Sequence, residues 1–362
     1  MECLSDHAVA ELAQGLLAGA DLAAAEAHLA ACDDCRVLVS ELARATPFPR
    51  SKAGSSDAPP EPERIADKYR VEGVLGVGGM GVVVAAMHEL LGERVAIKLP
   101  RGDLRDDPEA RARLLREARA AGRLRGEHIA RVLDVGVLDD GSPYIVMEHL
   151  TGQTLARRLE VEGPMRADDA AALGVAVCEA LGEAHALGIV HRDLKPANLF
   201  ETTRYDGSRL YKVLDFGIAK AQGFGPTTKS GALVGSPRYM SPEQLKSTRN
   251  VDARTDVWAL GATLFELVAG RPVFDGPTLS DVCAAIAQGP IPSLKATRPD
   301  APAWLDRVVR KCLERDPKSR YPTAAALAED LRRAGPRRVA PWFVGVVLAL
   351  ALAAVAVVAA RG

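Results

Sequence analysis

The stretch HRDLKPAN, at residues 191–198, follows a short apolar run and places two polar side chains, Asp193 and Asn198, five positions apart. An aspartate can accept the proton of a hydroxyl group, and an asparagine amide oxygen can bind a hard cation. The stretch therefore predicts a loop that carries both a proton acceptor and a cation ligand.

A second carboxylate follows another strand-like run. In VLDFG, at residues 213–217, Asp215 comes directly after the apolar segment. Carboxylate oxygens suit magnesium, which also keeps the phosphates of a substrate as ligands. With Asn198, this residue indicates a magnesium site that handles phosphate.

A glycine-rich segment lies upstream. GVGGMGVV, at residues 76–83, contains the pattern G-x-G-x-x-G, which is weak evidence by itself because it also opens dinucleotide-binding folds when a helix follows. Here a strand-like run follows at residues 82–86, which disfavours that fold. A loop between two strands can instead fold over phosphates and offer backbone N–H groups.

A lysine and a glutamate complete the set. Lys98 ends the apolar strand-like run VAIK, and Glu117 lies in the helical segment ARLLREARAAGRL. Taken singly, each is typical of a solvated strand end or helix face. Together they predict an ion pair that holds a lysine against phosphate oxygens.

In this order and these contexts, the five motifs resemble the protein kinases of the Hanks type, in particular the bacterial serine/threonine kinases. The resemblance covers residues 69–334, and we expect a kinase domain at 67–334. It implies an α+β, two-lobed protein kinase fold with a small β-rich N-lobe and a larger helical C-lobe.

The resemblance implies a role for each matching residue. Asp193 would orient the substrate hydroxyl and accept its proton, and Lys195 would stabilise negative charge on the transferring group. Asn198 and Asp215 would hold Mg²⁺. Lys98 would contact the α- and β-phosphates of ATP and pair with Glu117. Further nucleotide contacts are implied for the glycine-rich loop, the neighbouring strands and the hinge: Gly76, Val77, Gly78, Gly81, Val84, Ala96, Met147, Glu148, His149 and Leu150.

The same resemblance implies an activation segment between Asp215 and Glu243. Phosphate on Thr228 or Ser230 would pair with Arg192 and order the segment. Two structural supports are also implied. Glu243 would pair with Arg320, and the helix with Asp256 and Trp258 would brace the catalytic loop.

The predicted function is that of a non-specific serine/threonine protein kinase, which transfers the γ-phosphoryl group of ATP to protein hydroxyls in bacterial signal transduction. A pseudokinase scaffold is the alternative, but Lys98, Asp193, Asn198 and Asp215 are all present. The formal net charge of −1, with mixed signs along the chain, gives no indication of nucleic-acid binding.

Residues 1–45 predict a small helical unit that contains HLAACDDC at 28–35. His28, Cys32 and Cys35 would share one helix face and favour zinc, with Cys3 as the fourth ligand and His7 as the alternative. The pattern resembles the zinc-binding domain of anti-sigma factors, which implies zinc and leaves a protein partner open. Two incidental cysteines on an Ala-rich helix are the other interpretation, and a metal or redox sensor with a kinase output is a rival account of regulation.

The two remaining segments connect and anchor the domains. Residues 46–66 form a linker, with five prolines at 46–63. Residues 342–360 carry no charge, and we expect one transmembrane helix at 341–360, rather than a buried helix of a soluble domain. Four arginines precede the span and one follows, which predicts a cell-membrane protein with a cytoplasmic kinase domain and no sensor domain beyond the membrane. Cys178, Cys283 and Cys312 are expected to be buried core thiols.

Overall fold

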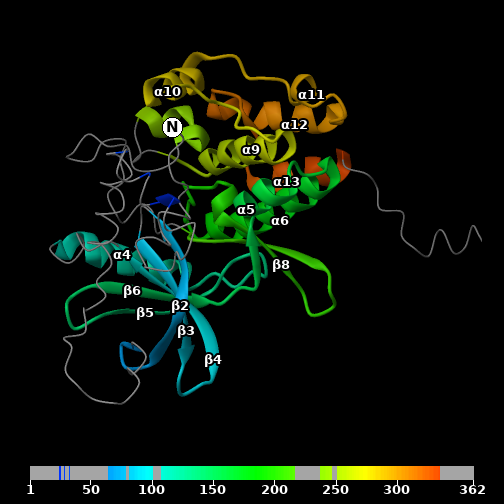
Figure 1. Cartoon of the computed structure of the whole chain (residues 1–362). Coiled ribbons are helices and arrows are strands. Elements are labelled where there is room, and N and C mark those ends of the chain that lie inside the picture. The colour runs from blue at the N-terminus through cyan, green and yellow to red at the C-terminus, as the bar shows by residue number, and fades with distance from the viewer. Residues whose placement is uncertain are drawn as a thin grey trace, which may run out of the picture. The chain divides into compact units, whose positions relative to one another are not determined.

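The computed structural model describes residues 24, 25, 28, 32, 64–78, 81–100, 107–216, 237–246 and 251–334. These residues divide into two compact units (Figure 1). Unit 1 comprises the described residues up to 123 together with 131–150. Unit 2 comprises residues 124–130 and the described residues from 151 onward.

Unit 1 is built on one antiparallel sheet of six strands, in the order β1-β2-β3-β4-β6-β5. The strands are β1 (Arg64–Ile65), β2 (Tyr69–Gly78), β3 (Gly81–His88), β4 (Glu93–Pro100), β5 (Val132–Val137) and β6 (Pro143–Glu148). The predicted strand-loop-strand arrangement of the glycine-rich segment is confirmed, because β2 and β3 pair down to Gly78 opposite Gly81. A Cβ on Gly81 would lie 2.1 Å from the carbonyl oxygen of Leu99, so only glycine fits there.

Helix α4 (Pro108–Ala121) packs beside β5 and β6 in Figure 1 and buries an apolar stripe against the sheet. Leu114, Ala118 and Ile145 form a small core at this contact. Asp107 is the N-cap, its carboxylate accepts a hydrogen bond from the Ala110 N–H at 2.9 Å, and Pro108 is the first helical residue.

Unit 2 is mostly helical and carries a three-stranded antiparallel sheet. The strands are β7 (Gly152–Thr154), β8 (Leu199–Thr203) and β9 (Arg209–Val213). Between Asn198 and Asp215 the chain forms a hairpin of β8 and β9. Its turn closes with a hydrogen bond from the Arg204 N–H to the Ser208 carbonyl.

The helices of unit 2 pack around α6 and α9. The α-helices are α5 (Leu155–Glu162), α6 (Ala167–Ala186), α8 (Pro242–Lys246), α9 (Arg254–Ala269), α10 (Leu279–Gln288), α11 (Leu294–Thr297), α12 (Ala303–Cys312) and α13 (Ala324–Ala334). Three short 3-10 helices are η2 (Pro196–Asn198), η3 (Pro237–Tyr239) and η4 (Pro317–Ser319). Helix α9 contacts α6, α12 and α13 and is buried on almost all sides, which fits its apolar sequence.

Three further sequence predictions concern the isolated cysteines, the membrane span and the zinc unit. Cys178 and Cys312 are buried as expected, but the prediction for Cys283 is wrong, because its position on α10 leaves it half-buried. The described residues contain no helix with the length and apolarity of a membrane span. The predicted transmembrane helix at 341–360 and most of the predicted zinc unit, Cys3 and Cys35 included, lie outside the described residues.

We expect Asp107→Ala to weaken the first turn of α4, because the Ala110 N–H loses its hydrogen-bond acceptor. An N-cap replacement of this kind costs about 1 kcal/mol. Hydrogen exchange of the α4 amides measures the effect, with faster exchange at residues 109–111 as the expected result. Asp107→Asn is the matched control, since asparagine also caps helices, and equal exchange in both variants would contradict the assignment.

Candidate active site

The catalytic loop of unit 2 is fixed by one buried carboxylate, Asp256 on α9, whose side chain is fully shielded from solvent. Oδ2 of Asp256 accepts hydrogen bonds from the backbone N–H of His191 at 2.9 Å and from Nε2 of His185 at 2.7 Å. Oδ1 accepts the backbone N–H of Arg192 at 2.9 Å. The expected bracing of the loop by this helix is confirmed, and three donors offset the cost of burying the carboxylate.

His191 connects the loop to the end of β9. Its Nδ1 lies 3.3 Å from the Asp193 N–H, which can only donate, and its Nε2 lies 2.8 Å from the Leu214 carbonyl, which can only accept. These partners require the neutral imidazole with its proton on Nε2. The ring also packs edge-to-face on Phe216, with centroids 5.0 Å apart.

Two non-glycine residues of this region adopt left-handed backbone conformations, Arg192 with φ 68° and Asp215 with φ 57°. Such conformations cost free energy and persist only where the surroundings enforce them. At Arg192 the peptide groups on both sides are held, because its N–H donates to Asp256 and its carbonyl accepts from Nε2 of Gln244 at 2.9 Å.

Asp193, Lys195 and Asn198 form one cluster, as the spacing in HRDLKPAN predicts. Nζ of Lys195 lies 2.9 Å from Oδ2 of Asp193 and 3.2 Å from Oδ1. Nδ2 of Asn198 donates to the Asp193 carbonyl at 2.7 Å and to Oδ2 at 2.9 Å. Every side chain of the cluster is at least partly buried, so the Asp193 carboxylate has a defined orientation.

The donor set fits a magnesium ion. Both hydrogens of the Asn198 amide nitrogen point at Asp193, which directs the amide oxygen away from that carboxylate and leaves it for a cation. The Leu214 N–H donates to the Asn198 carbonyl at 2.9 Å, so Asp215 follows directly after a segment tied to Asn198. Amide and carboxylate oxygens are the ligands that Mg²⁺ prefers.

A buried ion pair supports the loop from the C-terminal side. Nη1 and Nη2 of Arg320 lie 2.6 and 2.8 Å from the two Glu243 carboxylate oxygens, which confirms the predicted pair. The guanidinium is fully buried and packs over the ring of Trp258 at 5.0 Å. Burial alone would raise the pKa of Glu243, but the hydrogen bonds and charge of Arg320 hold that pKa below its ordinary value.

Unit 1 carries the predicted nucleotide contacts on β2, β3, β4 and β6. Lys98 is buried in β4, where it pairs with Val83 of β3 and Ile145 of β6. Ala96 lies opposite Met147, which places these two predicted contacts side by side. Glu117 lies in the same unit, on α4, and its ion pair with Lys98 stays a prediction.

The sequence motifs did not identify two residues that support the loop. His185 in the last turn of α6 hydrogen-bonds the Asp256 carboxylate that holds the loop, 71 positions away in the chain. Gln244 in α8 donates to the carbonyl of the loop residue Arg192, 52 positions away. Neither has a neighbouring motif, so only the folded chain brings them to the loop.

Among the described residues, no cluster of three or more His, Cys, Asp or Glu side chains has the arrangement of a metal site.

Comparison with known proteins decides the family. The family model described as protein kinase domain matches residues 69–331. The chain belongs to the protein kinase family. This kinase is 39% identical over 278 residues to the probable serine/threonine-protein kinase PknB of Corynebacterium glutamicum, covering 74% of this chain and 42% of that protein. It is 38% identical over 278 residues to serine/threonine-protein kinase PknB of Mycobacterium tuberculosis, covering 75% of this chain and 44% of that protein.

Solved structures agree with this assignment. The kinase domain of PknI from Mycobacterium tuberculosis matches with a TM-score of 0.60 at 29% identity, covering 77% of this kinase and all of that chain. The predicted resemblance to bacterial serine/threonine kinases is confirmed, and membership of the family implies ATP, Mg²⁺ and protein substrates. The chain spans about two fifths of the length of the curated relatives that it matches.

We expect Glu243→Gln to lower the free energy of unfolding at pH 7 by about 3 kcal/mol, because it leaves the buried Arg320 guanidinium without an opposite charge. The folded-state pKa of Glu243 is depressed, so its stabilisation is full above the ordinary value of 4.5 and is lost as the pH falls through the folded pKa. Urea unfolding at several pH values should therefore show the difference between wild type and variant shrinking toward low pH.

Glu160→Gln is the control for this experiment, because Glu160 forms an exposed pair with Arg157. Its effect should stay within about 1 kcal/mol at every pH. A Glu243→Gln effect that does not change with pH would contradict the role of the charge.

Proposed function

We propose that this chain is an ATP-dependent serine/threonine protein kinase that transfers the γ-phosphoryl group of ATP to serine and threonine hydroxyls of proteins. The observation that carries this proposal is the cluster of Asp193, Lys195 and Asn198, held on a loop that Asp256 fixes. A pseudokinase is disfavoured because the cluster is complete and its side chains are oriented by one another.

In the proposed reaction, the oxygen of the substrate hydroxyl attacks the γ-phosphorus of ATP while Asp193 accepts the hydroxyl proton. The bond between the γ-phosphorus and the β–γ bridging oxygen breaks, and ADP leaves. Asn198 and Lys195 both contact the Asp193 carboxylate, so they fix the direction in which it accepts that proton. The Lys195 ammonium group also stabilises negative charge on the transferring phosphoryl group.

The nucleotide would be held by the remaining predicted residues. Asn198 and Asp215 would bind Mg²⁺, which neutralises charge on the β- and γ-phosphates. Lys98, paired with Glu117, would hold the α- and β-phosphates. Gly76, Val77, Gly78, Gly81, Val84, Ala96, Met147, Glu148, His149 and Leu150 would surround the rest of the nucleotide.

Activation would proceed by autophosphorylation within the activation segment, at Thr228 or Ser230. The phosphate would pair with Arg192, whose backbone is already fixed by Asp256 and Gln244. A phosphorylated segment would thereby be tied to the loop that carries Asp193.

The flanking segments complete the proposal. Residues 1–45 would bind zinc through Cys3, His28, Cys32 and Cys35 and dock a protein partner, and residues 46–66 would link them to a kinase domain at 67–334. A transmembrane helix at 341–360 would place the kinase domain at the cytoplasmic face of the cell membrane. The Cys32 N–H donates to the His28 carbonyl at 2.9 Å, a helical i to i−4 contact that supports a shared face for these two ligands.

We expect Asp193→Asn to lower phosphoryl transfer by about 10²-fold or more, since the proton acceptor is lost, and Asp215→Ala to abolish it. Transfer from radiolabelled ATP to a generic protein substrate, with mapping of Thr227, Thr228 and Ser230, measures both effects. Asp206→Asn in the exposed β8–β9 turn is the control and should keep wild-type transfer. Normal labelling by Asp215→Ala would overturn the magnesium assignment.

We expect metal analysis of the full chain to give about one zinc per molecule, because three to four soft ligands favour that metal. Cys32→Ser should reduce the zinc content to a small fraction. Cys283→Ser, at a half-buried cysteine on α10, is the matched control and should leave it unchanged. Equal zinc contents in the two variants, or no zinc in wild type, would contradict the proposed site.

A further inference from the structure

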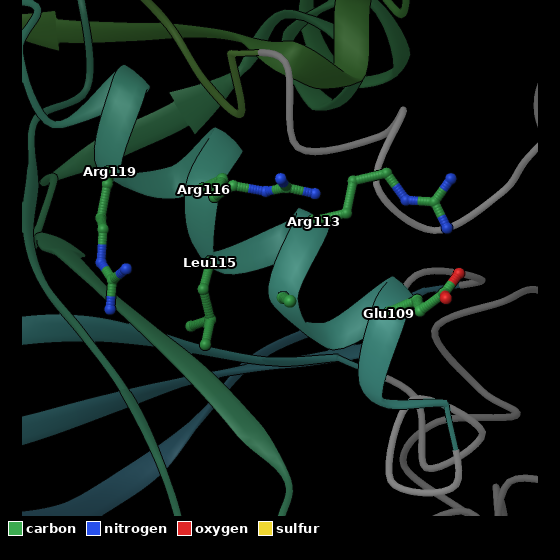
Figure 2. A pocket seen from close by; sticks show the side chains of 6 residues that line it. Glu109, Arg113, Leu115, Arg116 and Arg119 are labelled. Atoms are coloured by element: carbon green, nitrogen blue, oxygen red, sulfur yellow. The ribbon is translucent and has the colours of Figure 1, made fainter.

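Helix α4 carries a row of arginines on the side that does not pack on the sheet. Arg113, Arg116 and Arg119 follow one another at spacings of three, so they lie along neighbouring turns of the helix. Figure 2 shows the guanidinium groups of Arg113 and Arg116 extending to the same side. A depression of about 700 Å³ runs along this face and is lined by Glu109, Ala112, Arg113, Leu115, Arg116 and Arg119.

No described acidic side chain forms an ion pair with any of these three arginines. Some arginines on other helices of the described chain have such partners, as Arg157 does with Glu160 and Arg333 with Glu329, whereas Arg307 and Arg310 on α12 form no ion pair with a described acid either. Three arginines against one acidic residue, Glu109, give this side of α4 a positive charge that favours an acidic partner. We call Arg113, Arg116 and Arg119 the α4 basic face.

The chain contains a segment of opposite charge at its N-terminal end. Residues 1–45 carry two arginines and eight carboxylates, for a formal side-chain charge of −6: Glu2, Asp6, Glu11, Asp21, Glu26, Asp33, Asp34 and Glu41. The whole chain has a net charge of only −1, so this acidity is concentrated at the N-terminus.

The linker allows the two to meet. Residues 46–63 number 18 and lead directly into β1, which belongs to the same compact unit as α4. Fully extended, they span roughly 60 Å, and as a flexible chain about 23 Å. β1 and β5, the strand on which α4 packs, are the two edges of the six-stranded sheet and lie roughly 24 Å apart at about 4.8 Å per strand. The linker is long enough to cover this distance, so it keeps residues 1–45 at a high effective concentration around α4.

We propose that the acidic N-terminal unit, residues 1–45, docks on the α4 basic face of its own chain. The contact is electrostatic, so it forms at low salt and weakens as salt screens it. Because α4 also carries Glu117, a partner or a redox change that removes the unit would act on the helix that holds this residue. That regulatory consequence rests on the proposed kinase function, whereas the docking does not.

The test uses the full chain with Arg113→Lys, Arg116→Lys and Arg119→Lys, which keeps the charge and supplies primary amines. A carbodiimide then joins each amine to a carboxylate in direct contact, and mass spectrometry locates the links. The expected result is links from positions 113, 116 and 119 to carboxylates within residues 1–45, lost when salt is raised to about 1 M. The same pattern is expected in the Asp215→Ala background, so the result is independent of catalytic activity.

The matched control is Arg307→Lys with Arg310→Lys, two exposed arginines one turn apart on α12. These positions should give at least tenfold fewer links to residues 1–45, and equal yields would overturn the proposal. A mixture of isotope-labelled and unlabelled chains identifies the occupant. Links only between different chains would assign the face to a second copy, and links only to carboxylates outside residues 1–45 would assign it to another segment; either result overturns the proposal.

Discussion

The candidate active site depends on the hydrogen bonds that the buried Asp256 carboxylate accepts. It receives three hydrogen bonds inside unit 2, and two of them come from consecutive backbone N–H groups, those of His191 and Arg192. Consecutive donors can converge on one carboxylate only if the backbone turns sharply, and Arg192 is left-handed at this point. The buried charge therefore stabilises the backbone conformation that orients Asp193.

Further hydrogen bonds hold the loop on both sides of this carboxylate. His191 ties the loop to Leu214 at the end of β9, and the Leu214 N–H returns to Asn198. Gln244 holds the Arg192 carbonyl, and it belongs to the same helix as Glu243, which binds the buried Arg320. Asp193, Asn198 and Arg192 are thus parts of one hydrogen-bonded network. Such a network would supply the preorganisation that the proposed phosphoryl transfer requires.

The sequence predicts much of this network because its residues lie in short motifs. The five-residue spacing of Asp193 and Asn198 fits the short η2 turn, and the Asp107-Pro108 pair marks the start of α4. His185 and Gln244 could not be predicted, since their roles arise from tertiary contacts with residues far away in the chain. Cys283 was misassigned because an apolar local sequence does not reveal which side of a helix faces the core.

We expect Asp256→Asn to misplace Asp193, because the Asp256 carboxylate holds the loop that carries Asp193. The substitution keeps the shape but replaces one acceptor oxygen by a donor group that faces backbone N–H groups. Steady-state transfer to a protein substrate should show kcat lowered by about 10²-fold, as misplacement of a catalytic group by about 1 Å would cause, while chromatography and circular dichroism report a folded chain. A folded Asp256→Asn variant with the kcat of wild type would contradict the account.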